Sequence, residues 1–197
     1  ISISLIEPLA VCIHTSKLLD TKRVKNILLY GGGFLSQILS QILLNLRVKV
    51  TCVDRNEYKK DFFDNEISFF SSTNELNDSL FDVTIECCGA DGILEDCVRL
   101  TKTKGEIIQL ANPSVNSSIN SQTLSKLMRK ELSLKGTWNS LYRPDKKTKC
   151  EWQESIKMLV EKKINLKHLI SHEVGIDESA ELIEKIFLRR VNKDSLP

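Results

Sequence analysis

Three consecutive glycines, Gly31 to Gly33, stand between an apolar, β-like run at residues 26–30 and an apolar segment at 34–46. A second β-like run follows at 48–53 and ends on Asp54. The order strand, glycine turn, helix and strand within about 30 residues is that of one βαβ unit. This order restricts the chain to folds in which a parallel sheet carries a glycine turn at the end of a strand.

The same alternation continues along the chain. Further β-like runs lie at residues 67–70, 82–86, 106–110 and 132–138. Helical patterns separate them at residues 57–64, 92–101 and 122–129. Six strands separated by helices predict an α/β fold, a doubly wound and parallel six-stranded sheet of the Rossmann type, covered by helices on both faces.

Helical patterns also flank this alternating region. One precedes it at residues 7–19, and two follow it at 151–162 and 178–188. We therefore expect extra terminal helices. The expected division of the chain is residues 1–19, 20–140 and 141–197, with the sheet in the middle segment.

The composition excludes several classes of protein. Hydrophobic residues make up 41% and charged residues 27%, and 28 basic against 26 acidic side chains leave a net charge of +2. This balance predicts a folded chain with no general attraction to nucleic acid or to an anionic membrane. No apolar run approaches the roughly 20 residues that span a bilayer. The 6 cysteines lack CxxC spacing, which indicates reduced, mainly buried thiols in a cytoplasmic protein.

The glycine turn suits the diphosphate of a dinucleotide. Gly31 permits the tight turn, and Gly33 admits the diphosphate to the backbone amides at the positive end of the helix. Phe34 and Leu35 open that helix and complete the predicted contact. Ser36 stands where a third glycine normally allows close packing, and its extra atoms are expected to shift the helix slightly outward. A glycine-rich turn without a ligand is the alternative interpretation.

Asp54 closes the second strand about 20 residues after the first glycine, the spacing of the acid that accepts hydrogen bonds from the adenosine ribose. Its charge would repel a 2′-phosphate and therefore favours NAD over NADP. Arg55 follows directly and is able to pair with such a phosphate, so NADP stays open as the less favoured cofactor.

Two later loops are expected to line the nicotinamide half of the cofactor, because loops at the carboxyl ends of parallel strands converge there. They follow the fourth and fifth strands and contain Cys87, Cys88, Gly89, Leu110, Ala111 and Asn112. Ordinary connecting loops are the alternative. The two cysteines also suggest nucleophilic or redox chemistry, although no base accompanies them and buried thiols are commonly inert.

With these elements in place, the sequence resembles the medium-chain dehydrogenase/reductase family and, within it, the zinc-dependent polyol dehydrogenases. The matching stretches follow the family order over nearly the whole chain: residues 7–14, 30–33, 53–54, 82–89, 105–111 and 129–136. The resemblance implies that this chain is the NAD-binding portion of such an enzyme. It also implies that a catalytic domain with the cysteine and histidine zinc ligands lies outside the sequence.

The resemblance adds two site residues. Lys59 stands where the family has a lysine near the adenosine ribose, and Glu7 where a glutamate approaches or ligates the catalytic zinc. A carboxylate oxygen suits that ion. Without the resemblance, Glu7 is an acid at a helix start, favoured by the helix dipole. One carboxylate does not make a catalytic zinc site, so we expect the chain alone to be inactive.

The implied reaction is hydride transfer between a nicotinamide cofactor and a polyol or polyol phosphate of the galactitol-1-phosphate or sorbitol type. Two alternatives stay open. Ser36 suggests a non-catalytic nucleotide-binding module, and Arg55 suggests an NADPH-dependent sugar-phosphate reductase. The resemblance further implies a homodimer that pairs the edge strands at residues 132–138.

Overall fold

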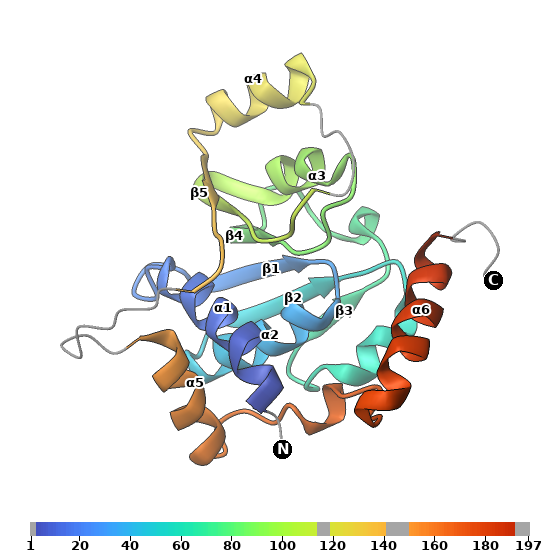
Figure 1. Ribbon diagram of the computed structural model, residues 1–197. Coiled ribbons are helices and arrows are strands. Elements are labelled where there is room, and N and C mark those ends of the chain that lie inside the picture. Colours follow the sequence, from blue (N-terminus) through green and yellow to red (C-terminus); the bar gives the residue numbers. More distant parts are fainter. Residues whose placement is uncertain (1–2, 114–118, 141–149, 192–197) are drawn as a thin grey trace.

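The computed structural model describes residues 3–113, 119–140 and 150–191. A parallel sheet lies at its centre (Figure 1). Its strands are β1 (Asn26–Tyr30), β2 (Lys49–Val53), β3 (Ser68–Phe70), β4 (Phe81–Glu86), β5 (Thr101–Gln109) and β6 (Ser133–Gly136). The 6-stranded sheet has the order β3-β2-β1-β4-β5-β6, and all neighbouring strands are parallel. This is the doubly wound Rossmann order, so the predicted fold class is confirmed.

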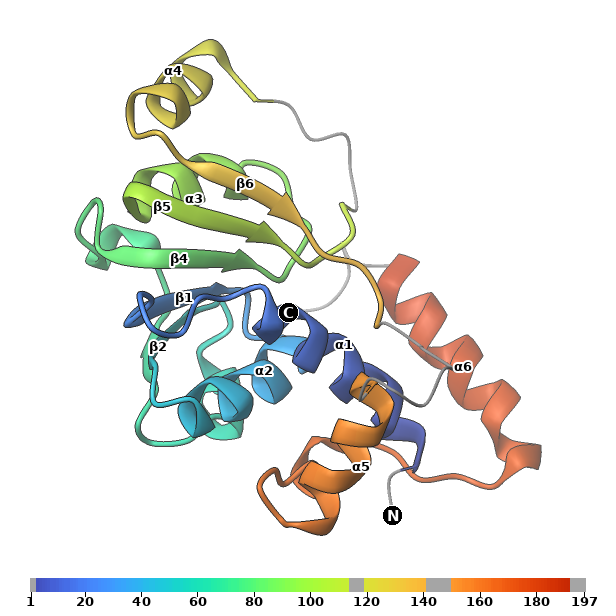
Figure 2. The same cartoon turned by 90° about the vertical axis from the view of Figure 1, so that its left-hand side faces the viewer.

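Helices cover both faces of the sheet. One face carries α1 (Ile6–Lys17), α2 (Phe34–Asn45) and α5 (Glu151–Val160), and the other carries α3 (Ile93–Leu100) and α4 (Ser121–Arg129) (Figure 2). The last described helix is α6 (Ile176–Val191). Single 3₁₀ turns are η1 (Ile3–Leu5), η2 (Glu57–Phe62), η3 (Thr73–Glu75) and η4 (Lys167–Leu169). None of the described helices has the length and apolar character needed to cross a membrane.

The two-sided core follows from the apolar run of β1. Ile27 and Leu29 point to the cluster that α1 and α2 share, whereas Leu28 packs with Phe81 on the opposite face. Successive side chains of a strand point to opposite faces, so a strand buried on both sides needs apolar residues at every position. This is why the central strands could be read from the sequence.

The terminal helices pack against each other on one face. Lys17 Nζ of α1 lies 3.2 Å from Glu151 Oε1 and 2.9 Å from Glu154 Oε1, both of α5. Ile164 and Leu166, which follow α5, are buried in the main core. The expected terminal helices are therefore present, and two of them, α1 and α5, pack on the sheet domain. Residues 141–149, which open the third predicted segment, lie outside the described part of the chain.

Two elements differ from expectation. The helix predicted at residues 57–64 is only the 3₁₀ turn η2. β5 begins at Thr101, directly after α3, several residues before the predicted start at 106. Its first residues are polar, and Lys102 pairs with Asp82 at 2.7 Å, so an apolar pattern does not mark this part of the strand.

Candidate functional site

The glycine bend closes the carboxyl end of β1. Gly31 has a φ of +104°, and its amide donates a 2.8 Å hydrogen bond to the carbonyl of Val53. A Cβ at this position would lie 2.8 Å from the Cβ of Cys88. Gly31 is therefore needed both for its backbone angle and for the close approach of the loop after β4.

In front of the bend, the first turn of α2 presents its amides. Gly33 is the residue before the helix, and a Cβ there would meet nothing within 4 Å. The first amides of a helix, here from Phe34 onward, have no partner within the helix and lie at its positive end. The space before Gly33 is therefore suited to an anion such as a diphosphate.

Ser36 packs inside this turn. Its side chain is fully buried, and its hydroxyl donates a hydrogen bond to the carbonyl of Gly31. The neighbouring Gln37 donates from Nε2 to the carbonyl of Gly32 at 3.0 Å. The residue that replaces the usual third glycine therefore binds the helix to the bend, because its hydroxyl has an acceptor within the motif.

Asp54 lies against the same bend. Its Oδ2 accepts hydrogen bonds from the Gly32 amide at 2.8 Å and from Lys59 Nζ at 2.6 Å, and its Oδ1 accepts one from the Asn56 amide at 2.9 Å. Burial alone would raise the pKa of Asp54, but the hydrogen bonds from Lys59, Asn56 and Gly32 outweigh it and lower the pKa below its ordinary value of 3.8. Asp54 is therefore ionised at neutral pH. Arg55, next to it, is exposed.

A cleft of about 670 Å³ runs along the bend. Its near wall holds Gly33 and Phe34, and Lys59 lies on the side of Asp54. The far wall is the segment 169–173, which follows η4 and comes from the other end of the chain. Three of the predicted cofactor residues therefore share one cleft, and no sequence pattern predicted its far wall.

A second cavity, of about 410 Å³, contains three of the residues predicted for the nicotinamide side, whereas Cys87, Cys88 and Gly89 of the loop after β4 do not line it. Glu7 lies at its edge, together with Leu35 of α2. The opposite side is formed by the loop after β5, which includes Leu110, Ala111 and Asn112. The structure thus places the candidate metal ligand beside the loop predicted to hold the reactive end of the cofactor.

The cysteines are poor candidates for nucleophiles. Every described cysteine is a free thiol, and Cys12, Cys52, Cys97 and Cys150 are buried. Burial raises the pKa of Cys87 and Cys88 to about 12 each. Both thiols are therefore protonated at neutral pH, which leaves little of the reactive thiolate.

Metal ligands are sparse in the described residues. Among residues 3–113, 119–140 and 150–191, no three His, Cys, Asp or Glu side chains lie together in a way that could hold a metal ion. His14 instead lies against α5, with Nδ1 3.6 Å from Glu151 Oε1. His172 lies in the wall of the larger cleft, which the glycine bend also lines. Glu7 alone does not make a zinc site.

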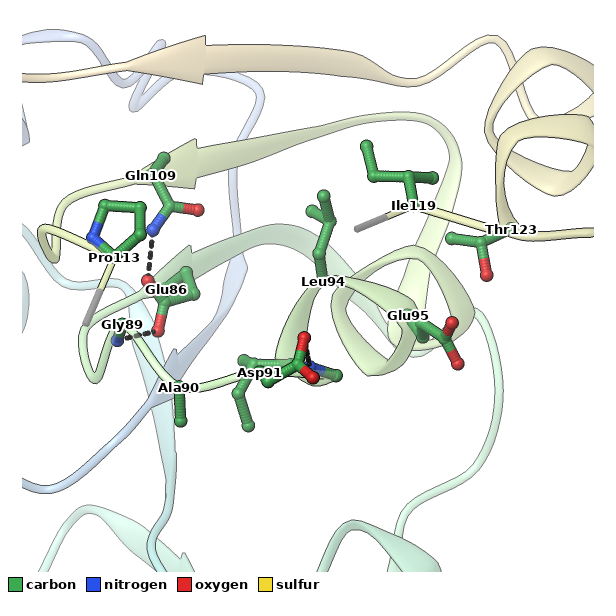
Figure 3. A pocket seen from close by; sticks show the side chains of 12 residues that line it. Glu86, Gly89, Ala90, Asp91, Leu94, Glu95, Gln109, Pro113, Ile119 and Thr123 are labelled. Carbon is green, nitrogen blue, oxygen red and sulfur yellow. Dashed lines mark hydrogen bonds between the residues drawn. The ribbon is translucent and has the colours of Figure 1, made fainter. Parts of the chain in front are cut away.

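Sequence reasoning missed Glu86 and Gln109, which lie beneath the two loops that follow β4 and β5 (Figure 3). Glu86 is only 2% exposed, and its carboxylate accepts a hydrogen bond from Gln109 Nε2. Both residues line a small cavity of about 160 Å³, next to Gly89. The available signal was a charged residue, Glu86, at the carboxyl end of the strand β4, where the loop toward the site begins.

Fold and glycine bend together define a Rossmann domain of the kind that dehydrogenases contain, and the comparisons with known proteins agree. No protein-family model matches the chain. Galactitol 1-phosphate 5-dehydrogenase of Escherichia coli K12 is 24% identical over 193 residues, covering 92% of this chain and 55% of the relative. Sorbitol dehydrogenase 1 of Saccharomyces cerevisiae is 23% identical over 199 residues, covering 89% and 51%. The predicted resemblance to polyol dehydrogenases is confirmed, and the chain spans about half the length of these curated relatives.

Solved structures show the same fold. The crystal structure of galactitol-1-phosphate dehydrogenase from Escherichia coli superposes with a TM-score of 0.77 at 24% identity, covering 98% of this chain and 57% of that one. A protein from Sinorhizobium meliloti described as a zinc-binding dehydrogenase, with NADP bound, has a TM-score of 0.73 at 18% identity and covers 91% of this chain and 54% of its own. Acetophenone reductase from Geotrichum candidum, with NAD bound, has a TM-score of 0.72 at 17% identity and covers 91% of this chain and 50% of its own.

Proposed function

We propose that this chain binds a nicotinamide dinucleotide across the carboxyl edge of its sheet. The diphosphate lies on the first-turn amides of α2, in front of Gly33. Asp54 and Lys59 take the adenosine ribose, and the nicotinamide reaches the cavity beside Ala111. The observation that carries this proposal is the 2.8 Å hydrogen bond between Asp54 and Gly32, which joins the ribose acid to the diphosphate bend.

Asp54 retains capacity for a ribose hydroxyl. A carboxylate offers about four lone-pair directions. Its described donors are the Gly32 amide and Lys59 on Oδ2 and the Asn56 amide on Oδ1. A hydroxyl that donates to Oδ1 would therefore complete the set without displacing Lys59.

NAD is the proposed cofactor. In the proposed binding mode the ionised Asp54 lies beside the ribose 2′ position, where its negative charge would repel a 2′-phosphate. Lys59 offsets part of this charge through its 2.6 Å contact with Asp54. The exposed Arg55 supports NADPH as the second candidate, because a guanidinium pairs well with a phosphate.

For the whole protein we propose a polyol or polyol-phosphate dehydrogenase that passes hydride from a secondary alcohol to the nicotinamide. Residues 1–19 and 141–197 would connect the dinucleotide domain to the catalytic part. Glu7 is the one zinc ligand that this chain would contribute. The described residues do not fit zinc by themselves, so the chain alone is expected to bind cofactor without oxidising a polyol.

Calorimetric titration of the chain with NADH and NADPH tests the cofactor proposal. The expected result is one site per chain, with NADH bound more tightly than NADPH. Tighter binding of NADPH would support the reductase alternative. Binding of neither would reject the dinucleotide site, and binding without turnover in the whole protein would support a nucleotide-sensing module.

We also propose a homodimer in which β6 pairs with β6 of a second copy. β6 has β5 as its neighbour on one side and forms the end of the sheet on the other. Leu134 of this strand is 46% exposed, and Trp138 just beyond it is 74% exposed. An edge strand with apolar side chains is a ready surface for pairing, and light scattering measures the resulting mass.

A further inference from the structure

Glu86 ends β4 with its carboxylate turned under the loop that follows. Its Oε1 accepts hydrogen bonds from the amides of Cys88 and Gly89, both at 2.7 Å. Its Oε2 accepts one from Gln109 Nε2, as the dashed lines in Figure 3 show. The buried carboxylate therefore has donors on both of its oxygens.

The same residue also binds the second loop. The backbone carbonyl of Glu86 accepts hydrogen bonds from the amides of Leu110 at 3.0 Å and Ala111 at 3.1 Å. Gln109 Nε2 donates in addition to the carbonyl of Ala111 at 2.9 Å. Glu86 thus holds four amides, and all four belong to residues predicted to line the cofactor.

The loops after β4 and β5 pack directly against each other, which leaves no room for an added side-chain atom at their contact. Gly89 has a φ of +66°, and a Cβ there would lie 2.2 Å from the carbonyl oxygen of Asn112. A Cβ on Gly31 would lie 2.8 Å from the Cβ of Cys88. The loop after β4 therefore contacts the glycine bend on one side, through Cys88, and the loop after β5 on the other, through Gly89.

A carboxylate suits this place better than a neutral side chain. Each of its oxygens only accepts hydrogen bonds, whereas a glutamine amide would turn two N–H bonds toward groups that are themselves donors. Hydrogen bonds to an ionised acceptor are also roughly twice as strong as neutral ones. Replacing the acid by its amide therefore changes the bonding while keeping the size of the side chain.

We propose that Glu86 is a positioning residue, which acts through the loops after β4 and β5 and sets the nicotinamide half of the site. This inference rests on the proposed function, because those loops are assigned there to the nicotinamide. Glu86 neither lines the cleft in front of Gly33 nor bonds to Asp54 in the described structure, so its substitution should affect the adenosine and diphosphate contacts less than the nicotinamide contacts.

The test compares NADH with ADP-ribose, which has the adenosine, ribose and diphosphate groups but lacks nicotinamide. For Glu86→Gln, the Kd for NADH is expected to rise about tenfold or more, while the Kd for ADP-ribose stays within about twofold. A general loss of structure would weaken the binding of NADH and of ADP-ribose to the same extent. Equal changes for the two ligands, or no change for either, would overturn the proposal.

Asp82→Asn is a matched control at the other end of β4. Asp82 Oδ2 accepts hydrogen bonds from the amides of Lys25 and Asn26, both at 2.9 Å, and Oδ1 accepts one from Lys102. It therefore makes the same kind of bonds as Glu86, at the edge away from the site. Its variant is expected to keep the preference for NADH over ADP-ribose, and a loss of that preference would count against a local role for Glu86.

Gln109→Met provides a second variant if Glu86→Gln does not fold. It removes the donor shared by Glu86 and the Ala111 carbonyl while keeping a side chain of similar length. A smaller but equally selective loss of NADH affinity is expected, and an unselective loss would contradict the proposal. If the unaltered chain bound neither ligand, the proposed function would fail, and that result is distinct from a failure of Glu86 alone.

Discussion

The carboxylate of Asp54 and the amide of Gly32 are joined by a 2.8 Å hydrogen bond, so the end of β2 is bound to the glycine bend that follows β1. Lys59 reaches the same carboxylate oxygen from η2 at 2.6 Å. Two strand ends and a 3₁₀ turn therefore meet at one oxygen atom. This contact fixes the distance between the proposed ribose and diphosphate sites before any ligand binds.

Removing the charge of Asp54 should change cofactor choice. Asp54→Asn is expected to weaken the binding of NADH by about tenfold, since a hydrogen bond from the ribose to a charged acceptor is lost. NADPH should be affected less, because the repulsion of its 2′-phosphate also disappears. Calorimetric titration measures both affinities. Asp61→Asn is the control, because Asp61 is exposed and lies in η2, the 3₁₀ turn that holds Lys59. An equal loss for both cofactors would contradict the assigned role.

Acidification should destabilise the protein partly through Asp54. Its pKa is lowered in the folded state below the ordinary 3.8. The stabilisation is therefore complete above the ordinary pKa and is lost as the pH falls through the lowered one. Denaturant unfolding at a series of pH values should show a steeper acid loss for the unaltered chain than for Asp54→Asn. Parallel curves would show that the hydrogen bonds to Asp54 do not favour its ionised form.

The buried hydroxyl of Ser36 should contribute to stability. Ser36→Ala removes the donor to the Gly31 carbonyl and is expected to cost about 1–3 kcal/mol of unfolding free energy, because that carbonyl loses its partner. Ser40→Ala is a matched control on the same helix, 1% exposed, whose hydroxyl bonds to a carbonyl of its own helix at 3.0 Å. Urea unfolding compares the two, and an equal cost would argue against a special role for Ser36.

Gly89 and Gly92 allow backbone strain to be separated from contact between loops. Both have a positive φ, +66° and +76°, so alanine at either position should cost about 1–2 kcal/mol in backbone strain. A Cβ on Gly89 would also strike Asn112, whereas one on Gly92 meets nothing within 4 Å. Gly89→Ala should therefore be the more destabilising of the two and the one that weakens NADH binding. Thermal unfolding and titration of both variants check this, and identical behaviour would show that the loops move apart freely.

The proposed dimer predicts a change of mass on substitution in β6. Leu134→Lys introduces a charge at the edge where the strands would pair, and the expected product is a monomer. Leu124→Lys, on α4 and exposed to a similar extent at 49% against 46%, should leave the mass unchanged. Sedimentation or light scattering distinguishes these states. A monomeric unaltered chain would reject the dimer.

The unit from β1 to β2 could be predicted because its signals are local. The apolar run of β1 is buried on both faces, and the glycines that follow it permit a tight turn that other residues adopt only with strain. The position of Asp54 beside the bend could be predicted for the same reason, since its distance along the chain from Gly31 is set by one helix and one strand. Lys59 came from the family resemblance, and the structure places its ammonium on Asp54.

The rest required contacts that spacing does not encode. The role of Glu86 depends on how two loops fold back over it, and no periodic pattern marks that. The far wall of the larger cleft, residues 169–173, comes from the opposite end of the chain. Trp138 was expected to continue the last strand, but β6 ends at Gly136 and Trp138 is exposed.

The ion pair between Lys17 and Glu151 also affects how the protein is made. The two residues are 134 positions apart. During synthesis, α1 leaves the ribosome before α5, and all six strands are translated in between, a delay on the order of ten seconds. The ion pair therefore forms only after every strand is available to assemble, whereas α1 can pack on α2 within the main core earlier.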